Sequence, residues 1–89
     1  MRFTWDDAKA EGNYKKHKVT FEHAATVFES NYTYIGDIAE HYEQREKIIC
    51  FDNMGRILTV IYTQLDDETI RIISARKATP NERKQYGNR

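Results

Sequence analysis

Apolar positions in the first third of the chain follow a helical spacing. The i, i+3, i+4, i+7 pattern of a buried helix face is formed by Phe21, Ala24, Ala25 and Phe28. Thr20 precedes this stripe as an N-cap, and Asn31 is a suitable end because asparagine tolerates left-handed backbone. These residues predict a helix that packs one face against the rest of the molecule.

A short strand and another helix are predicted before this stripe. The first five residues alternate so that Phe3 and Trp5 share one face of a strand. Asp6 or Asp7 then caps a helix that reaches about His17.

Beyond Tyr32 the pattern becomes that of strands and turns, with β-branched and aromatic residues in short runs. The predicted strands are residues 32–37, which form a weak one, 45–52, 57–63 and 69–76. The predicted connections are a loop at 38–44, a turn at 53–55 and an acidic turn at 65–68.

A final short helix is predicted to run to about Tyr86. Thr79 is its N-cap, Pro80 occupies its first position, and Glu82 lies at capping-box spacing from the cap. The resulting order, β-α-α-β-β-β-β-α, predicts a small α+β fold. We expect one domain over residues 1–89, with an antiparallel sheet packed by the two N-terminal helices and followed by the short C-terminal helix.

Charge changes this picture because it is unevenly distributed. The 14 basic and 14 acidic residues cancel over the whole chain. Residues 1–18 carry a net charge of +2, residues 19–53 carry −5, and residues 54–89 carry +3. A neutral total argues against a non-specific DNA coat, but a basic end beside an acidic middle is compatible with a local anion site.

Several classes are excluded by the remaining composition. Apolar runs are far shorter than the ~20 residues that span a bilayer, and the N-terminus has no apolar signal region, so we expect a cytoplasmic protein without a membrane partner. The single cysteine, Cys50, excludes an internal disulfide and reads as a buried thiol. His17, His23 and His41 lack metal-ligand spacing, so no metal site is predicted.

Two blocks of sequence carry more information than the composition does. The first block contains Trp5-Asp6-Asp7-Ala8-Lys9-Ala10, Asn13, Lys16-His17, Val19-Thr20-Phe21-Glu22 and Ala24-Ala25-Thr26-Val27-Phe28. The second block contains Gly55-Arg56, Tyr62-Thr63, Ile70-Arg71-Ile72-Ile73-Ser74-Ala75-Arg76, Ala78, Glu82-Arg83 and Tyr86. Together they strongly resemble the BrnT family, the toxin half of a bacterial type II toxin–antitoxin pair.

The resemblance implies a RelE-like fold, metal-independent ribonuclease activity without a cofactor, and inhibition of translation and growth. It also implies neutralisation by a BrnA-type antitoxin, and binding of promoter DNA only through the antitoxin complex. The implied RNA substrate is mRNA, either free or on the ribosome.

The sequence departs from the family pattern in three places. Lys18 stands where the family usually has a glycine that ends the helix. Leu65 stands where the family often has a basic residue, and the acidic turn at 66–68 is about one residue longer. An acidic turn repels phosphate, and this feature favours a copy that binds without cutting.

Metal-free RNA cleavage needs a proton-transfer group and cations that stabilise the charge developing on the phosphate. Arg71 and Arg76 are the first candidates, because the guanidinium is always charged and forked. Positions five apart face opposite sides of a regular strand, so these two share a site only if the strand ends or bulges near Ala75. The alternative is that Arg71 is a sheet residue paired with an acid such as Glu82.

His17 is the candidate for proton transfer, because its reference pKa lies near neutrality. Lys9 is eight residues earlier on the same predicted helix, and Lys16 is a candidate RNA contact beside His17. The alternatives are structural: His17 interacts with the helix dipole, and Lys9 lies on a solvated face.

The basic C-terminal segment supplies further candidate RNA contacts, namely Lys77, Arg83 and Tyr86. Arg83 and Tyr86 lie three apart and share a helix face, so one can meet phosphate and the other can stack on a base. The alternative is that Tyr86 packs back on the sheet.

Three functions fit the sequence. The first is a BrnT-type ribonuclease, which the two motif blocks favour. The second is a degenerate toxin that still binds an antitoxin. The third is a small nucleic-acid-binding or protein-interaction domain, whose binding to RNA or DNA weakens with salt.

Overall fold

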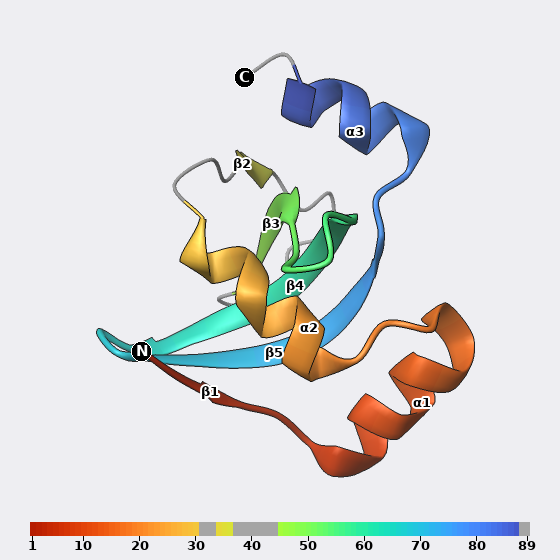
Figure 1. The fold of residues 1–89 in the computed structure, drawn as a ribbon. Helices are drawn as coiled ribbons and strands as arrows, with labels where there is room; N and C mark the ends of the chain where they lie inside the picture. The colour runs from red at the N-terminus through yellow and green to blue at the C-terminus, as the bar shows by residue number, and fades with distance from the viewer. Residues whose placement is uncertain (31–33, 37–44, 88–89) are drawn as a thin grey trace.

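The computed structural model describes residues 1–30, 34–36 and 45–87 of the 89-residue chain. Their elements are β1 (Arg2–Thr4), α1 (Asp7–His17), α2 (Phe21–Ala25), the 3₁₀ turn η1 (Thr26–Glu29), β2 (Tyr34–Gly36), β3 (Arg45–Phe51), β4 (Ile57–Asp66), β5 (Thr69–Lys77) and α3 (Pro80–Gly87). This order confirms the predicted α+β succession (Figure 1). The predicted loop at 38–44, the helix end at Asn31, and His41 lie outside the described residues.

The prediction of a wholly antiparallel sheet is wrong at one edge. The five strands lie in the order β1-β5-β4-β3-β2, and β1 pairs with β5 in parallel, whereas the other pairs are antiparallel. Strand β1 reaches the outer edge of β5 because α1 and α2 carry the chain across the sheet before β2 begins (Figure 1). Local sequence patterns do not specify such a long-range pairing.

The main core lies between α2 with η1 and one face of the sheet. Phe21 and Val27 are fully buried, and the ring of Phe28 meets Tyr62 edge-on at 5.0 Å between centroids. Trp5 packs edge-on against Phe21 at 5.9 Å. The apolar stripe is therefore confirmed, although its last turn is a 3₁₀ turn rather than α-helix.

The predicted caps are present at the start of each helix. The Asp6 carboxylate accepts a hydrogen bond from the Lys9 N–H at 2.9 Å, and the Thr20 hydroxyl accepts one from the His23 N–H at 3.1 Å. At α3, Thr79 and Glu82 form the reciprocal capping box, with distances of 2.9 and 3.1 Å. No helix in the described part of the chain is long and apolar enough to cross a membrane.

Helix α1 ends at a strained residue. Lys18 adopts the left-handed conformation, with φ 60° and ψ 29°, and its N–H donates to the carbonyl of Tyr14 at 2.8 Å. Glycine normally adopts this conformation at a helix end, because it has no Cβ. Lys18 keeps the same geometry, but its Cβ adds a steric cost.

Candidate functional site

A β-bulge brings Arg71 and Arg76 to the same face of the sheet. In the β4–β5 register Ser74 pairs with Ile61 and Ile72 pairs with Tyr62, so Ile73 is an extra residue. The bulge reverses the alternation along β5, and Arg71 and Arg76 then lie opposite Thr63 and Thr59, which share one face of β4. The sequence required a bulge near Ala75 if the two arginines were to share a site. The structure has this bulge at Ile73, two residues earlier.

The same register adds two cations from β3. Arg45 pairs with Thr63, and Lys47 pairs with Ile61, so both lie on the side of Arg71 and Arg76. We call Arg45, Lys47, Arg71 and Arg76 the basic face. It lies on the side of the sheet opposite Tyr62 and α2, and sequence spacing alone did not group its members.

Arg71 and Arg76 have different environments within this face. Their partners on β4 are four residues apart, which places the two backbones about 13 Å apart. Arg71 is exposed, and no ion pair to it is present among the residues that the structure describes. Arg76 instead forms two parallel hydrogen bonds to Glu82, from Nη1 to Oε1 at 2.6 Å and from Nη2 to Oε2 at 3.0 Å.

The acid that the sequence suggested for Arg71 therefore belongs to Arg76. Burial of the Glu82 carboxyl acts to raise its pKa, but hydrogen bonds from Arg76 and the Thr79 N–H outweigh it and hold the pKa at about 2. The Lys47 Nζ also lies 3.8 Å from Glu82 Oε2. Glu82 thus caps α3 and anchors two members of the basic face with one ionised carboxylate.

Asn13 fastens α1 to the edge of β5 beyond the end of β1. Its side-chain amide donates to the carbonyl of Ala75 at 2.9 Å and to that of Val19 at 3.0 Å, and its Oδ1 accepts from the Ala75 N–H at 3.1 Å. The side chain substitutes for a neighbouring strand at this point. It is 9% exposed, in keeping with a structural joint.

This joint places two candidate residues beside the strand that bears the arginines. Lys9 and His17 lie four residues before and after Asn13, so all three share one face of α1. Lys9 is exposed and His17 is partly buried. Sequence reasoning missed the role of Asn13, because its contacts with Ala75 join residues 62 positions apart.

The candidate RNA contacts lie in three different environments. Lys77 and Arg83 both line a pocket of about 310 Å³ at the end of β5, whereas Lys16 is exposed on the last turn of α1. Tyr86 is 8% exposed, and its hydroxyl lies 3.8 Å from Cys50 Sγ. Its ring packs inward, as the structural alternative predicted, so stacking on a base would require α3 to shift.

The acidic turn lies at the other end of the β4–β5 hairpin. Leu65 is a second extra residue, between the pairs made by Gln64 and Asp66, and it is 53% exposed. The backbone N–H of Glu68 donates to the Asp66 carboxylate at 2.8 Å and lowers its pKa. Leu65 therefore forms a bulge, and the turn remains negatively charged.

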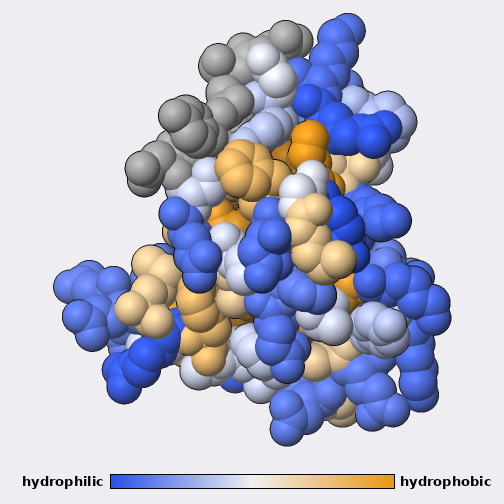
Figure 2. Space-filling view, viewed as in Figure 1, coloured by the Kyte–Doolittle hydropathy of each residue, from blue (hydrophilic) through white to orange (hydrophobic). Residues whose placement is uncertain are grey.

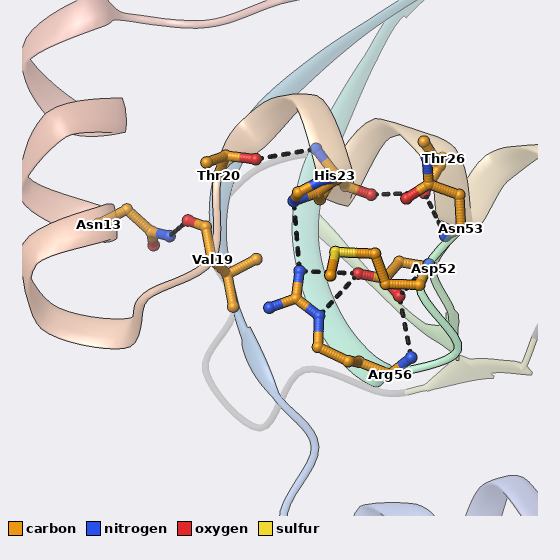
Figure 3. A network of polar contacts seen from close by, with 9 residues as sticks. Asn13, Val19, Thr20, His23, Thr26, Asp52, Asn53 and Arg56 are labelled. Carbon is orange, nitrogen blue, oxygen red and sulfur yellow. Dashed lines mark hydrogen bonds and ion pairs between the residues drawn. The ribbon is translucent and has the colours of Figure 1, made fainter.

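A polar network secures the turn between β3 and β4 to α2 (Figure 3). Arg56 donates from Nε and Nη2 to Asp52 Oδ2 at 3.0 and 2.8 Å, and its Nη2 lies 3.3 Å from His23 Nδ1. The Thr26 hydroxyl accepts a hydrogen bond from the Asn53 N–H at 2.9 Å. Among the described residues, no group of three or more His, Cys, Asp or Glu could hold a metal ion.

The fold and basic face define a small α+β protein with cations on one side of a mixed sheet. Residues 5–82 match the family described as the ribonuclease toxin BrnT of type II toxin–antitoxin systems, and the chain belongs to this family. Membership of a type II toxin–antitoxin family implies an antitoxin partner for this chain.

A solved structure supports the same assignment. The chain is similar to the Brucella abortus ribonuclease toxin BrnT, whose crystal structure was determined at 1.1 Å resolution, with a TM-score of 0.69 and 25% identity. The alignment covers 89% of this chain and 97% of the Brucella protein. Among curated proteins, no sequence matches the chain.

Proposed function

We propose that this chain is an active endoribonuclease that cleaves RNA without a metal and thereby inhibits translation. The observation that carries the proposal is the bulge at Ile73, which puts Arg71 and Arg76 on one face of the sheet. The Asn13 joint supports it, because it holds the helix that bears Lys9 and His17 against the same strand.

The proposed chemistry is an intramolecular transfer at phosphorus. A base removes the proton from the ribose 2′-OH, the oxygen attacks the adjacent phosphate, and an acid protonates the departing 5′-oxygen. The products are a 2′,3′-cyclic phosphate and a 5′-hydroxyl. His17 is the proton-transfer residue in this proposal, and Lys9 and Arg71 stabilise the charge on the phosphate.

Arg76 has a different proposed task from Arg71. Its guanidinium is held by Glu82, so it offers its remaining N–H groups in a fixed orientation. The two backbones are about 13 Å apart, and Arg76 therefore contacts a neighbouring phosphate unless its side chain bends toward Arg71. Lys16, Lys77 and Arg83 are the proposed RNA-binding residues, with Tyr86 joining them only if α3 shifts.

The proposed partner is a BrnA-type antitoxin that covers the basic face or α3. The net charge of −5 in residues 19–53 and the outer strand β2 provide further surface for it. In this proposal the protein acts on mRNA in the cytoplasm, free or on the ribosome, and promoter DNA is bound only through the antitoxin complex.

Two observations favour a second candidate, a toxin-like module that binds an antitoxin or nucleic acid without cleavage. Arg76 is already neutralised by Glu82, and Leu65 leaves the acidic turn without an added cation. A site with one exposed arginine stabilises phosphate less than a site with two.

The test is cleavage of a defined RNA by the purified chain in EDTA. We expect 2′,3′-cyclic phosphate ends, and Arg71→Ala lowers the cleavage rate about 100-fold, as removal of a transition-state donor does. Lys84→Ala is the control, because Lys84 is exposed on α3 outside the proposed site. An intact fold with no cleavage, or equal rates for wild type and Arg71→Ala, refutes the proposal.

A further inference from the structure

A pocket at the end of β5 is formed by three separate parts of the chain. Gly55 and Arg56 come from the turn between β3 and β4, Ile57 and Ala78 flank the ends of β4 and β5, and Lys77 and Arg83 complete the lining. The Ala78 N–H donates to the Ile57 carbonyl at 2.9 Å and closes the floor between the two strands. The volume of about 310 Å³ is at the lower end of the range for small-ligand sites, roughly 300–1,000 Å³.

One lining residue of the pocket, Arg56, is held rigidly by an ion pair. Asp52, whose side chain is fully buried, accepts hydrogen bonds from the backbone N–H groups of Met54 and Arg56, each at 2.9 Å, and from the Arg56 guanidinium. Burial acts to raise the pKa of Asp52, but these hydrogen bonds lower it below its usual value. The carboxylate therefore stays ionised and fixes Arg56 between the turn and His23 (Figure 3).

The other two cations supply the net charge. In the part of the chain that the structure describes, neither the Lys77 ammonium nor the Arg83 guanidinium is in an ion pair, and no lining residue is acidic. Hydrophilic side chains also cover the visible surface of α3 (Figure 2). A ligand with negative charge is therefore favoured in the pocket.

The acidic turn does not oppose an anion at this position. Lys77 pairs with Leu58 at one end of β4, and Thr69 pairs with Asp66 at the other, so eight residues, or about 26 Å, separate the two ends. Charges on the surface are largely screened beyond about 8 Å at physiological ionic strength. Repulsion by the acidic turn concerns Arg71 far more than it concerns this pocket.

We propose that the pocket is an RNA subsite that holds one nucleotide, with its phosphate between Lys77 and Arg83 and the turn residue Arg56 beside it. Lys77 directly follows Arg76, and successive strand residues face opposite sides, so the subsite lies around the end of β5 from the basic face. The proposal rests on the proposed function for the identity of the ligand as RNA. It adds Arg56 to the proposed RNA contacts and defines a second position at which the RNA is held.

The test measures binding of a fluorescent 2′-O-methyl RNA hexamer, which has no 2′-OH and is not cleaved. Arg83→Gln and Lys77→Gln are each expected to weaken binding about fivefold to tenfold and to reduce the slope against log salt by about one. Lys84→Gln is the matched control, because Lys84 is exposed, follows Arg83 on α3 and does not line the pocket. It is expected to change binding less than twofold.

Backbone NMR of the intact chain supplies a second readout. Adenosine 5′-monophosphate is expected to shift the amide signals of Gly55 and Ala78, and Arg83→Gln is expected to remove these shifts. Equal weakening by Arg83→Gln and Lys84→Gln, or unmoved amides at both positions, overturns the subsite. The subsite is also overturned if acidic peptides bind in the pocket and neither the hexamer nor the nucleotide does.

Because the hexamer is not cleavable, failure of the subsite differs from failure of the proposed activity. Loss of RNA cleavage in Arg71→Ala with unchanged hexamer binding in Arg83→Gln leaves the activity and removes the subsite. Weakened binding in Arg83→Gln, with no RNA cleavage by the wild type, leaves the subsite and removes the activity.

Discussion

Replacement of Glu82 by Gln tests the ion pair that joins α3 to the basic face. Gln is expected to keep the capping hydrogen bond from the Thr79 N–H while it removes the charge that meets Arg76 and Lys47. The variant therefore isolates the electrostatic share of the contact. Its effect follows from the pKa of Glu82, which falls from 4.5 to about 2 in the fold.

A carboxyl with a lowered pKa stabilises the fold above its unfolded pKa and loses that contribution as pH falls toward its folded pKa. The full lowering of the Glu82 pKa would correspond to about 3 kcal/mol of folding stability. We expect a contribution of about 2 kcal/mol, because the Arg76 side chain is partly exposed and solvent screens the pair. Glu82→Gln should thus lower the free energy of unfolding by about 2 kcal/mol at pH 7. The difference from wild type should shrink between pH 4.5 and about 2.

Urea unfolding followed by circular dichroism at pH 7, 5, 4 and 3 measures this difference. Other carboxyls titrate in both proteins, so their effects cancel in the comparison. Glu11→Gln is the control, because Glu11 and Lys15 form an exposed pair and its loss should cost less than about 0.5 kcal/mol at every pH. A difference between wild type and Glu82→Gln that stays constant from pH 7 to 3 would refute the reasoning.

Two further predictions concern α1. Asn13→Ala leaves the buried N–H and carbonyl of Ala75 without the side-chain partner and is expected to lower the free energy of unfolding by about 2–3 kcal/mol in urea; a loss below 0.5 kcal/mol would contradict the joint. Lys18→Gly relieves a left-handed backbone and is expected to raise the free energy of unfolding by about 0.5–1 kcal/mol by thermal melting, whereas an unchanged or lower melting temperature would argue against strain there.

Features set by neighbouring residues could be predicted from the sequence, and features set by distant ones could not. The three N-caps and the capping box depend on groups within three residues, so the helix starts at Asp6, Thr20 and Thr79 were predicted correctly. The parallel position of β1 and the contact from Asn13 to Ala75, 62 residues away, depend on tertiary pairing. No local signal specifies either one.

The candidate site shows the same division. The sequence identified Arg71 and Arg76 and stated the geometric condition for a shared site, but it did not locate the bulge at Ile73. It assigned Glu82 to the capping box and named that acid as a partner for the wrong arginine. The strand register determines where the bulge lies, and the position of α3 determines which arginine Glu82 meets.

Induced expression of this chain alone in bacteria, with total RNA mapped for new 5′ ends, tests the central claim most directly. The wild type is expected to arrest growth and create new 5′-hydroxyl ends, and co-expression of its antitoxin should prevent both. Arg71→Ala, expressed to the same soluble level, should restore growth and leave the RNA intact. Normal growth with uncut RNA for the soluble wild type, or arrest that Arg71→Ala does not relieve, would contradict the account.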